Sequence, residues 1–102
     1  MRGGPRFDSW VAHMEGYVYL LRSESSGILY LGATEDPSNR EKEHNKGTTE
    51  ATRGKGPWKM VQHWVCRDIA QAKRIEYKIK KKKRKLSVEF VDYCVKNMRD
   101  EM

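Results

Sequence analysis

Residues 16–45, GYVYLLRSESSGILYLGATEDPSNREKEHN, decide the fold of this chain. Two short runs of β-branched, aromatic and aliphatic residues, 17–21 and 28–32, lie on either side of a Ser-Ser-Gly sequence. This pattern is typical of a β-hairpin whose loop holds several residues. The stretch therefore predicts two antiparallel strands at the start of the fold.

A polar segment follows the second strand and carries the signals of a helix. Asp36 can cap the N-terminus, and Pro37 fits the first helical position, where no backbone N–H is needed. Gly47 can adopt the left-handed conformation that ends a helix. These signals predict a helix over residues 37–46.

Four polar side chains of these elements can meet. Arg40 and His44 are four residues apart and share one face of the predicted helix. Tyr19 and Tyr30 lie on the two neighbouring strands. We expect both phenols to converge with the guanidinium and the imidazole at one end of the hairpin. The alternative is that the tyrosines are ordinary packing residues of a sheet.

Three more elements complete the chain. Residues 58–66 alternate, which predicts a strand with Trp58, Met60, Gln62, Trp64 and Cys66 on one side. Asp68 begins a capping-box sequence before apolar residues at helical spacing, Ile69, Ala72, Ile75 and Ile79. Ser87 can cap a last helix whose apolar stripe should cover the sheet.

The order strand, strand, helix, strand, helix, helix predicts the fold class. We expect an α+β fold, an α/β sandwich in which a three-stranded antiparallel sheet is flanked by helices. The length of 102 residues suits one domain. Residues 1–13 show no periodicity and are interpreted as an expression scar or a disordered arm, which leaves residues 14–102 as the domain.

The composition favours a polyanionic partner. There are 21 Lys and Arg residues against 14 Asp and Glu residues, a net charge of +7. Such an excess strengthens binding to phosphates through counterion release, although basic charge also serves solubility. Cys66 and Cys94 form no metal-ligand or disulfide pattern, so we expect buried, reduced thiols. No apolar run is long enough for a membrane span and no signal peptide is visible, so a cytoplasmic protein is expected.

The motifs resemble those of the GIY-YIG nuclease superfamily, over roughly residues 15–91. Tyr-Val-Tyr at 17–19 and Tyr-Leu-Gly at 30–32 resemble its paired tyrosine motifs, and Glu76 on a predicted helix continues the match. The other matching positions, in order, are Thr34, Asp36, Arg40, His44, Asn45 and the run from Thr52 to Trp58. The chain is most similar to the short single-domain bacterial members and to the nuclease domain of the eukaryotic structure-specific endonuclease that cuts branched DNA.

The resemblance implies a role for each candidate site residue. Tyr19 would be the general base, and Glu76 would hold a single Mg²⁺ or Mn²⁺ ion. Arg40 would meet the phosphate of a DNA substrate. Tyr30 would orient water or phosphate, and His44 would assist proton transfer or hold the phosphate. Because the ordinary pKa of tyrosine is about 10, nearby cations would have to favour the phenolate.

The basic residues allow two interpretations. Glu76 is four residues before Lys80, so the plain alternative to a metal ligand is an intrahelical ion pair. Phosphate contacts are expected from Arg53, Lys55, Lys80, Lys81, Lys82, Lys83, Arg84 and Lys85. The alternatives are a flexible connector around Arg53 and a solvated helix end whose cations suit the helix dipole.

Three positions depart from the family pattern. Leu31 stands where Ile is usual, which conserves volume. Ala33 stands where some members have a lysine or an aromatic residue that tunes the tyrosine. Glu41 stands where related chains usually carry Leu or Ile, and residues 37–46 contain no apolar side chain. We therefore expect a weakly held helix and a poorly positioned Arg40 in the free protein.

The sequence thus favours a metal-dependent DNA endonuclease, weakly specific or structure-selective, because so short a chain has little surface for reading bases. Two other hypotheses remain. One is a nucleic-acid-binding module that keeps the fold and has lost useful activity. The other is a catalytic subunit that is silent until a partner protein orders its helix and presents DNA.

Overall fold

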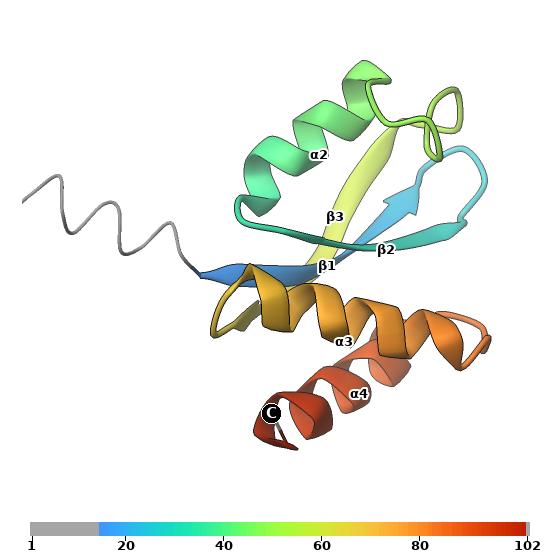
Figure 1. Ribbon diagram of the computed structural model, residues 1–102. Helices are drawn as coiled ribbons and strands as arrows, with labels where there is room; N and C mark the ends of the chain where they lie inside the picture. Colours follow the sequence, from blue (N-terminus) through green and yellow to red (C-terminus); the bar gives the residue numbers. More distant parts are fainter. Residues whose placement is uncertain (1–14, 102) are drawn as a thin grey trace, which may run out of the picture.

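The structure is a computed structural model that describes residues 15–101, so the interpretation of residues 1–13 lies outside the described residues. The predicted order of elements is confirmed (Figure 1). The elements are β1 (Gly16–Ser23), β2 (Leu29–Thr34), α2 (Pro37–Lys46), β3 (Trp58–Cys66), α3 (Ile69–Lys81) and α4 (Val88–Glu101).

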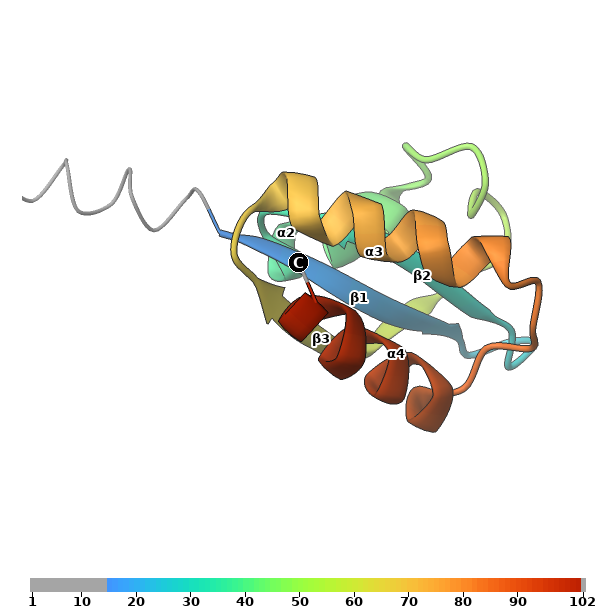
Figure 2. The ribbon, with the colours of Figure 1, turned by 60° about the horizontal axis from the view of Figure 1, so that its bottom comes forward.

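The three strands form one antiparallel sheet with the order β2-β1-β3. Helix α2 covers one face, and helices α3 and α4 cover the other (Figures 1 and 2). The alternation along β1 explains this sandwich. Val18 and Leu20 lie in the main core with α3 and α4, whereas Tyr19 and Leu21 belong to a smaller cluster on the α2 side. The predicted fold class is therefore confirmed.

A β-bulge in β3 divides its buried residues between the two faces. The pairing with β1 passes from Met60 to Gln62, so Val61 has no partner residue. Trp58, before the bulge, packs in the cluster of Tyr19, and Trp64, after it, packs in the main core. The sequence pattern had placed both tryptophans on one side, and the extra residue at the bulge is the reason that they separate.

The predicted helix ends are confirmed. Asp36 accepts the Asn39 N–H at the start of α2, Pro37 occupies the first turn, and Gly47 ends the helix with a φ of 80°. Asp68 accepts the Gln71 N–H at 2.8 Å at the start of α3. The Ser87 hydroxyl likewise accepts the Phe90 N–H at 3.1 Å at the start of α4. Local capping thus sets where each helix begins.

Helix α2 is fixed by polar contacts in place of apolar ones. Glu41 Oε2 accepts the backbone N–H of Met60 at 2.6 Å, beside the bulge. The Asn45 side chain accepts the Trp58 N–H at 2.6 Å and donates to the Trp58 carbonyl at 2.9 Å. These contacts correct the expectation of a weakly held helix, which had considered apolar packing alone. They fix the backbone that carries Arg40.

Both cysteines, Cys66 and Cys94, are buried and unpaired, as expected. Burial raises the pKa of each thiol, which keeps it protonated. Among residues 15–101, no helix combines the length and the apolar character that crossing a membrane requires.

Candidate active site

Tyr19 lies at the centre of the site, on β1 and under α2. Its side chain is 1% exposed. It faces Gly32 of β2 across the sheet, and a Cβ at that position would overlap the phenol ring and its oxygen. Glycine is therefore the residue that leaves room for the phenol.

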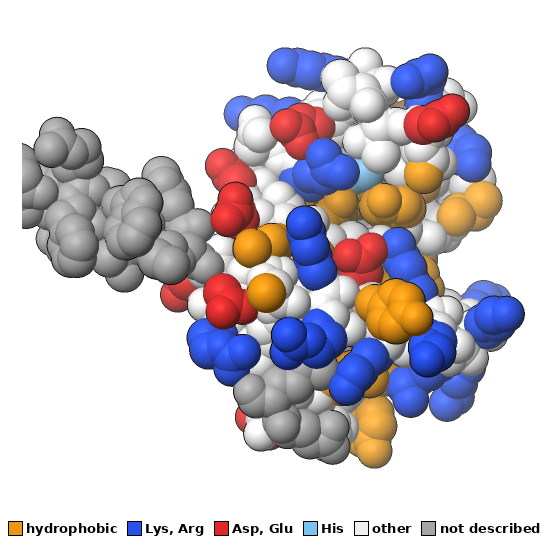
Figure 3. Space-filling view, in the orientation of Figure 1, with side chains coloured by type: hydrophobic (Ala, Val, Ile, Leu, Met, Phe, Trp, Pro, Cys, Tyr) orange, Lys and Arg blue, Asp and Glu red, His pale blue; other side chains and the backbone are white. Residues whose placement is uncertain are grey.

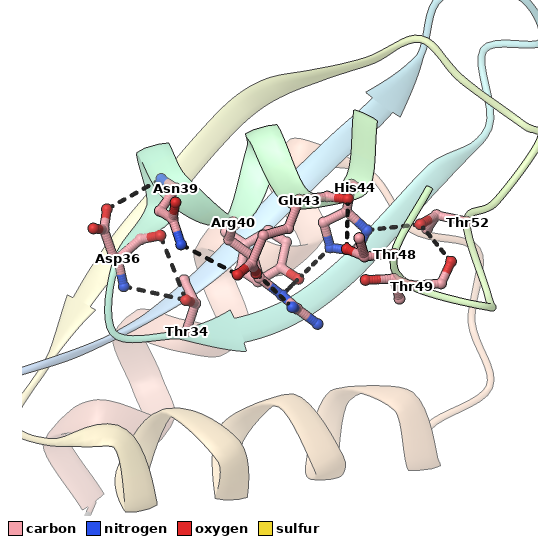
Figure 4. A network of polar contacts seen from close by, with 10 residues as sticks. Thr34, Asp36, Asn39, Arg40, Glu43, His44, Thr48, Thr49 and Thr52 are labelled. Carbon is pink, nitrogen blue, oxygen red and sulfur yellow. Dashed lines mark hydrogen bonds and ion pairs between the residues drawn. The ribbon is translucent and has the colours of Figure 1, made fainter. Parts of the chain in front are cut away.

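Two side chains of α2 contact the phenol oxygen of Tyr19. His44 Nε2 lies 2.8 Å from it, and Arg40 Nε donates to it at 3.3 Å. Arg40 and His44 point from the same side of α2 toward the sheet, as Figure 4 shows. Arg40 also forms an ion pair with Glu43 at 2.8 Å. The expected convergence of Tyr19, Arg40 and His44 is thus present in the free protein.

The loop after α2 holds the other side of the imidazole. His44 Nδ1 lies 2.7 Å from the hydroxyl of Thr52, which is 1% exposed (Figure 4). That hydroxyl donates to the Thr49 carbonyl at 3.4 Å. The Trp58 indole N–H donates to the Thr52 carbonyl at 3.1 Å, which fixes the loop against β3. His44 is therefore clamped between the sheet and the loop.

The donors and acceptors of this network assign the His44 tautomer. The Thr52 hydroxyl hydrogen goes to the Thr49 carbonyl, so the hydroxyl oxygen accepts from His44 Nδ1–H. His44 Nε2 is then a free acceptor for the Tyr19 hydroxyl, while Arg40 donates to the same phenol oxygen. The opposite tautomer would leave the buried Tyr19 hydroxyl hydrogen without any of these acceptors. Tyr19 therefore donates its proton toward His44.

Burial and charge set the protonation of this pair. Burial is the largest cause that raises the pKa of Tyr19 to about 12, and the Arg40 hydrogen bond and charge oppose it. Burial, followed by the positive charge of Arg40, lowers the pKa of His44. The resting pair is thus a neutral phenol beside a neutral imidazole.

Tyr30 lies beside this pair on β2. Its ring centroid is 5.0 Å from that of His44 and 6.4 Å from that of Tyr19. The ring also meets Trp58 edge-on at 6.3 Å. Tyr30 therefore joins the predicted cluster through ring contacts and forms its wall next to α3.

Glu76 approaches the cluster from α3. Its side chain is 21% exposed and pairs with Lys80 at 2.7 Å. Its charge contributes to the raised pKa of Tyr19, which is consistent with a carboxylate near the phenol. The intrahelical pair considered as the plain alternative is thus formed.

The protein ligands available near Glu76 determine which kind of metal ion it could hold. Within residues 15–101, no three His, Cys, Asp or Glu side chains come together as a metal site. A single carboxylate fits Mg²⁺ or Mn²⁺ when water and a substrate phosphate complete the octahedron. It does not fit a structural zinc site, which needs four protein ligands.

The family described as "GIY-YIG catalytic domain" matches residues 15–89. The chain belongs to this GIY-YIG family. The motifs at Tyr19, Tyr30 and Glu76 all lie inside the matched region, and the family predicted from them is confirmed.

Several similar GIY-YIG relatives are short bacterial chains. A UPF0213 protein of Pectobacterium carotovorum is 39% identical over 71 residues, which cover 69% of this chain and 71% of the relative. A UPF0213 protein of Halalkalibacterium halodurans is 38% identical over 68 residues, covering 66% of this chain and 71% of the relative. A solved structure that is similar to this chain is the solution NMR structure of the UPF0213 protein BH0048 from Bacillus halodurans. The two sequences are 33% identical, the alignment covers 84% of this chain and 87% of that chain, and the TM-score is 0.42.

The basic residues predicted for DNA lie in two regions of this GIY-YIG domain. Arg53 donates to the Gly47 carbonyl at 3.0 Å, and Lys55 is exposed in the same loop. The other predicted residues, Lys80, Lys81, Lys82, Lys83, Arg84 and Lys85, are exposed at the end of α3 and beyond it. Figure 3 shows Lys and Arg side chains along α3, on a face that α2 and β2 share.

Two side-chain contacts in the GIY-YIG site were not predicted from the sequence. Glu43 pairs with Arg40, and their spacing of three residues on a helix is a signal that could have revealed it. Thr52 holds His44 across a loop, and no local pattern marks such a contact. Glu43 balances the charge of Arg40, and Thr52 sets the tautomer of His44.

Proposed function

We propose that the chain is a metal-dependent DNA endonuclease that hydrolyses phosphodiester bonds. The observation that carries the proposal is the directed chain of hydrogen bonds from Arg40 through Tyr19 and His44 to Thr52. Such a chain gives a buried tyrosine both a place to send its proton and a cation to stabilise its oxygen. A buried tyrosine that only packs in a strand also needs an acceptor for its hydroxyl hydrogen, but it needs no guanidinium at its oxygen.

Tyr19 would act as a general base by proton relay. A phenol with a pKa of about 12 is protonated at neutral pH and cannot accept a proton as it stands. It can accept one from the attacking water while it passes its own proton to Nε2 of His44. Water then forms the new bond to phosphorus, and the bond to the 3′ oxygen breaks. The imidazolium, disfavoured by burial, returns its proton to solvent or to the leaving oxygen.

The other residues would bind and orient the phosphate. Arg40 would turn from Glu43 to a phosphoryl oxygen while keeping its charge near the phenol. Tyr30 would position water or phosphate beside His44. Glu76 would hold a single Mg²⁺ or Mn²⁺ ion, which supplies charge neutralisation at the phosphate when bound.

The proposed substrate preference follows from the charge of the surface. Lysine and arginine contacts to phosphates give affinity without reading sequence. Arg53, Lys55 and the basic residues at the end of α3 suit that use. We therefore propose weakly specific or structure-selective nicking of DNA by this domain.

A second candidate is a catalytic subunit that needs a partner protein, and one feature of the resting site favours it. Tyr19 and His44 are 1% and 2% exposed, and both Arg40 and Glu76 are paired within the protein. For this candidate we expect that DNA alone does not open the site. A partner that presents DNA would then restore cleavage where added metal does not.

The test is cleavage of labelled duplex, single-stranded, flap and four-way-junction DNA with Mg²⁺ or Mn²⁺. The parent is compared with Glu76→Ala and with Glu89→Ala, a control that removes an exposed carboxylate of α4. We expect cleavage that requires metal, disappears in Glu76→Ala and persists in Glu89→Ala.

Other outcomes separate the alternatives. Salt-sensitive binding to every substrate without cleavage by the parent would refute an autonomous nuclease and leave a binding module or a partner-dependent subunit. Cleavage by Glu76→Ala at the parental rate would refute the assigned metal ligand.

A further inference from the structure

Lys80 forms an ion pair with Glu76, the carboxylate proposed to hold the metal. Its ammonium lies 2.7 Å from Glu76 Oε2. The same ammonium lies 5.3 Å from the ring centroid of Tyr30, over the ring face. Lys80 therefore links Glu76 on α3 to the aromatic wall on β2, next to the Tyr19–His44 pair.

A comparison within the protein shows that this contact differs from an ordinary surface pair. Lys96 and Asp92 have the same spacing of four residues on α4, at 3.1 Å, with side chains 62% and 31% exposed. Lys80 and Glu76 are closer and less exposed, at 47% and 21%. The ring of Tyr30 also gives the Lys80 ammonium a second favourable contact.

Because few ligands are available, a metal ion and Lys80 would compete for Glu76. No group of three His, Cys, Asp or Glu side chains that could hold a metal ion exists within residues 15–101, so Glu76 does not belong to a cluster of protein ligands. A divalent ion and the Lys80 ammonium must therefore bind the same carboxylate. Each cation weakens the binding of the other there, because like charges at that distance repel.

We propose that the Lys80 ammonium competes with the divalent metal ion for the Glu76 carboxylate. It keeps the ion from this carboxylate until a DNA phosphate attracts the ammonium away. This inference rests on the proposed role of Glu76 as the metal ligand. Metal entry requires the ammonium to leave, and the freed ammonium can then bind a DNA phosphate beside Tyr30. By reciprocity, a phosphate that attracts Lys80 also raises the affinity of Glu76 for metal.

The test measures metal binding by the free protein, without any reaction. Mn²⁺ broadens the amide NMR signals of residues near its binding site, so a titration followed at Ile75, Glu76 and Tyr77 gives the affinity at Glu76. The variants are Lys80→Gln and Lys96→Gln. Both remove one positive charge and one ion pair of the same spacing, so the change in net charge is matched. Lys80→Arg restores the charge.

We expect Lys80→Gln to bind Mn²⁺ at Glu76 about two- to five-fold more tightly than the parent, the range that loss of a partly exposed ion pair gives. Lys96→Gln and Lys80→Arg should remain at the parental affinity. Equal affinities in Lys80→Gln and Lys96→Gln would overturn the competition while leaving the metal site intact. Absence of broadening near Glu76 in the parent and in every variant would overturn both the competition and the metal site at Glu76. Because Lys80 is exposed, we expect the variants to fold, and circular dichroism checks this.

Discussion

Gly32 lies directly opposite Tyr19 across β2 and β1, and a Cβ at Gly32 would overlap the phenol ring. Gly32→Ala must therefore displace Tyr19 from His44. We expect the free energy of unfolding to fall by about 1–3 kcal/mol, as for other overpacked sites. Urea titration measures this loss.

A double-mutant cycle assigns that loss to the phenol. In a Tyr19→Ala background the space beside position 32 is empty, so Gly32→Ala should change stability little. An equal loss of stability in both backgrounds would show that the cost arises from the backbone and not from contact with Tyr19.

Glu41 should be required for a well-positioned α2. Glu41→Leu removes the acceptor of the Met60 N–H, so we expect a loss of about 1 kcal/mol and faster amide exchange in α2. Glu41→Gln keeps an acceptor oxygen and should retain most of the stability. A Leu variant as stable as the parent, with unchanged exchange, would show that apolar packing holds the helix equally well.

Glu41 and Asn45 also show where prediction from the sequence ends. Hydrophobic alternation and local caps, such as Asp36 and Gly47, gave the elements and their order, because these signals lie within a few residues. Side-chain contacts to the backbone of β3, 13 and 19 residues away, carry no periodic signal.

The same limit applies within the site. Tyr19, Tyr30, Arg40 and His44 came together as expected, because a hairpin and one helix face fix their positions. The contact of Thr52 with His44 was not predicted, because it depends on the path of a loop. The bulge at Val61 is equally invisible in an alternating pattern, since one extra residue changes the pairing and not the composition.

Releasing Arg40 from Glu43 should strengthen DNA binding. Glu43→Gln removes the charge that pairs with Arg40 at 2.8 Å, so phosphate no longer competes with a carboxylate. We expect affinity about two- to five-fold higher, the range for a partly exposed ion pair. Fluorescence anisotropy at fixed salt measures it, with Glu24→Gln as the control for net charge. A gain in affinity of the same size in Glu24→Gln would show that the net charge, and not the release of Arg40, strengthens DNA binding.

The titration of His44 should reveal its burial. Because burial lowers its pKa from the ordinary 6.5, the unfolded chain binds a proton just below pH 6.5 while the folded chain does not. Stability that depends on neutral His44 is thus present above pH 6.5 and is lost as the pH falls toward the lowered pKa.

NMR measures this titration and the tautomer together. We expect a His44 midpoint below 6.5 and, at neutral pH, the long-range ¹H–¹⁵N pattern of an Nδ1–H imidazole. A midpoint at or above 6.5, or a proton on Nε2, would contradict the proposed direction of the relay.

Removal of the Tyr19 hydroxyl is the sharpest test of the proposed general base. Tyr19→Phe keeps the ring in its packed position and removes only the oxygen that joins Arg40 to His44. Single-turnover cleavage of the preferred DNA with Mg²⁺ should fall by about 10²–10⁴-fold, the contribution of a general base, while binding of the DNA stays at the parental affinity. Cleavage by Tyr19→Phe at the parental rate would show that the tyrosine is a packing residue and that the base lies elsewhere.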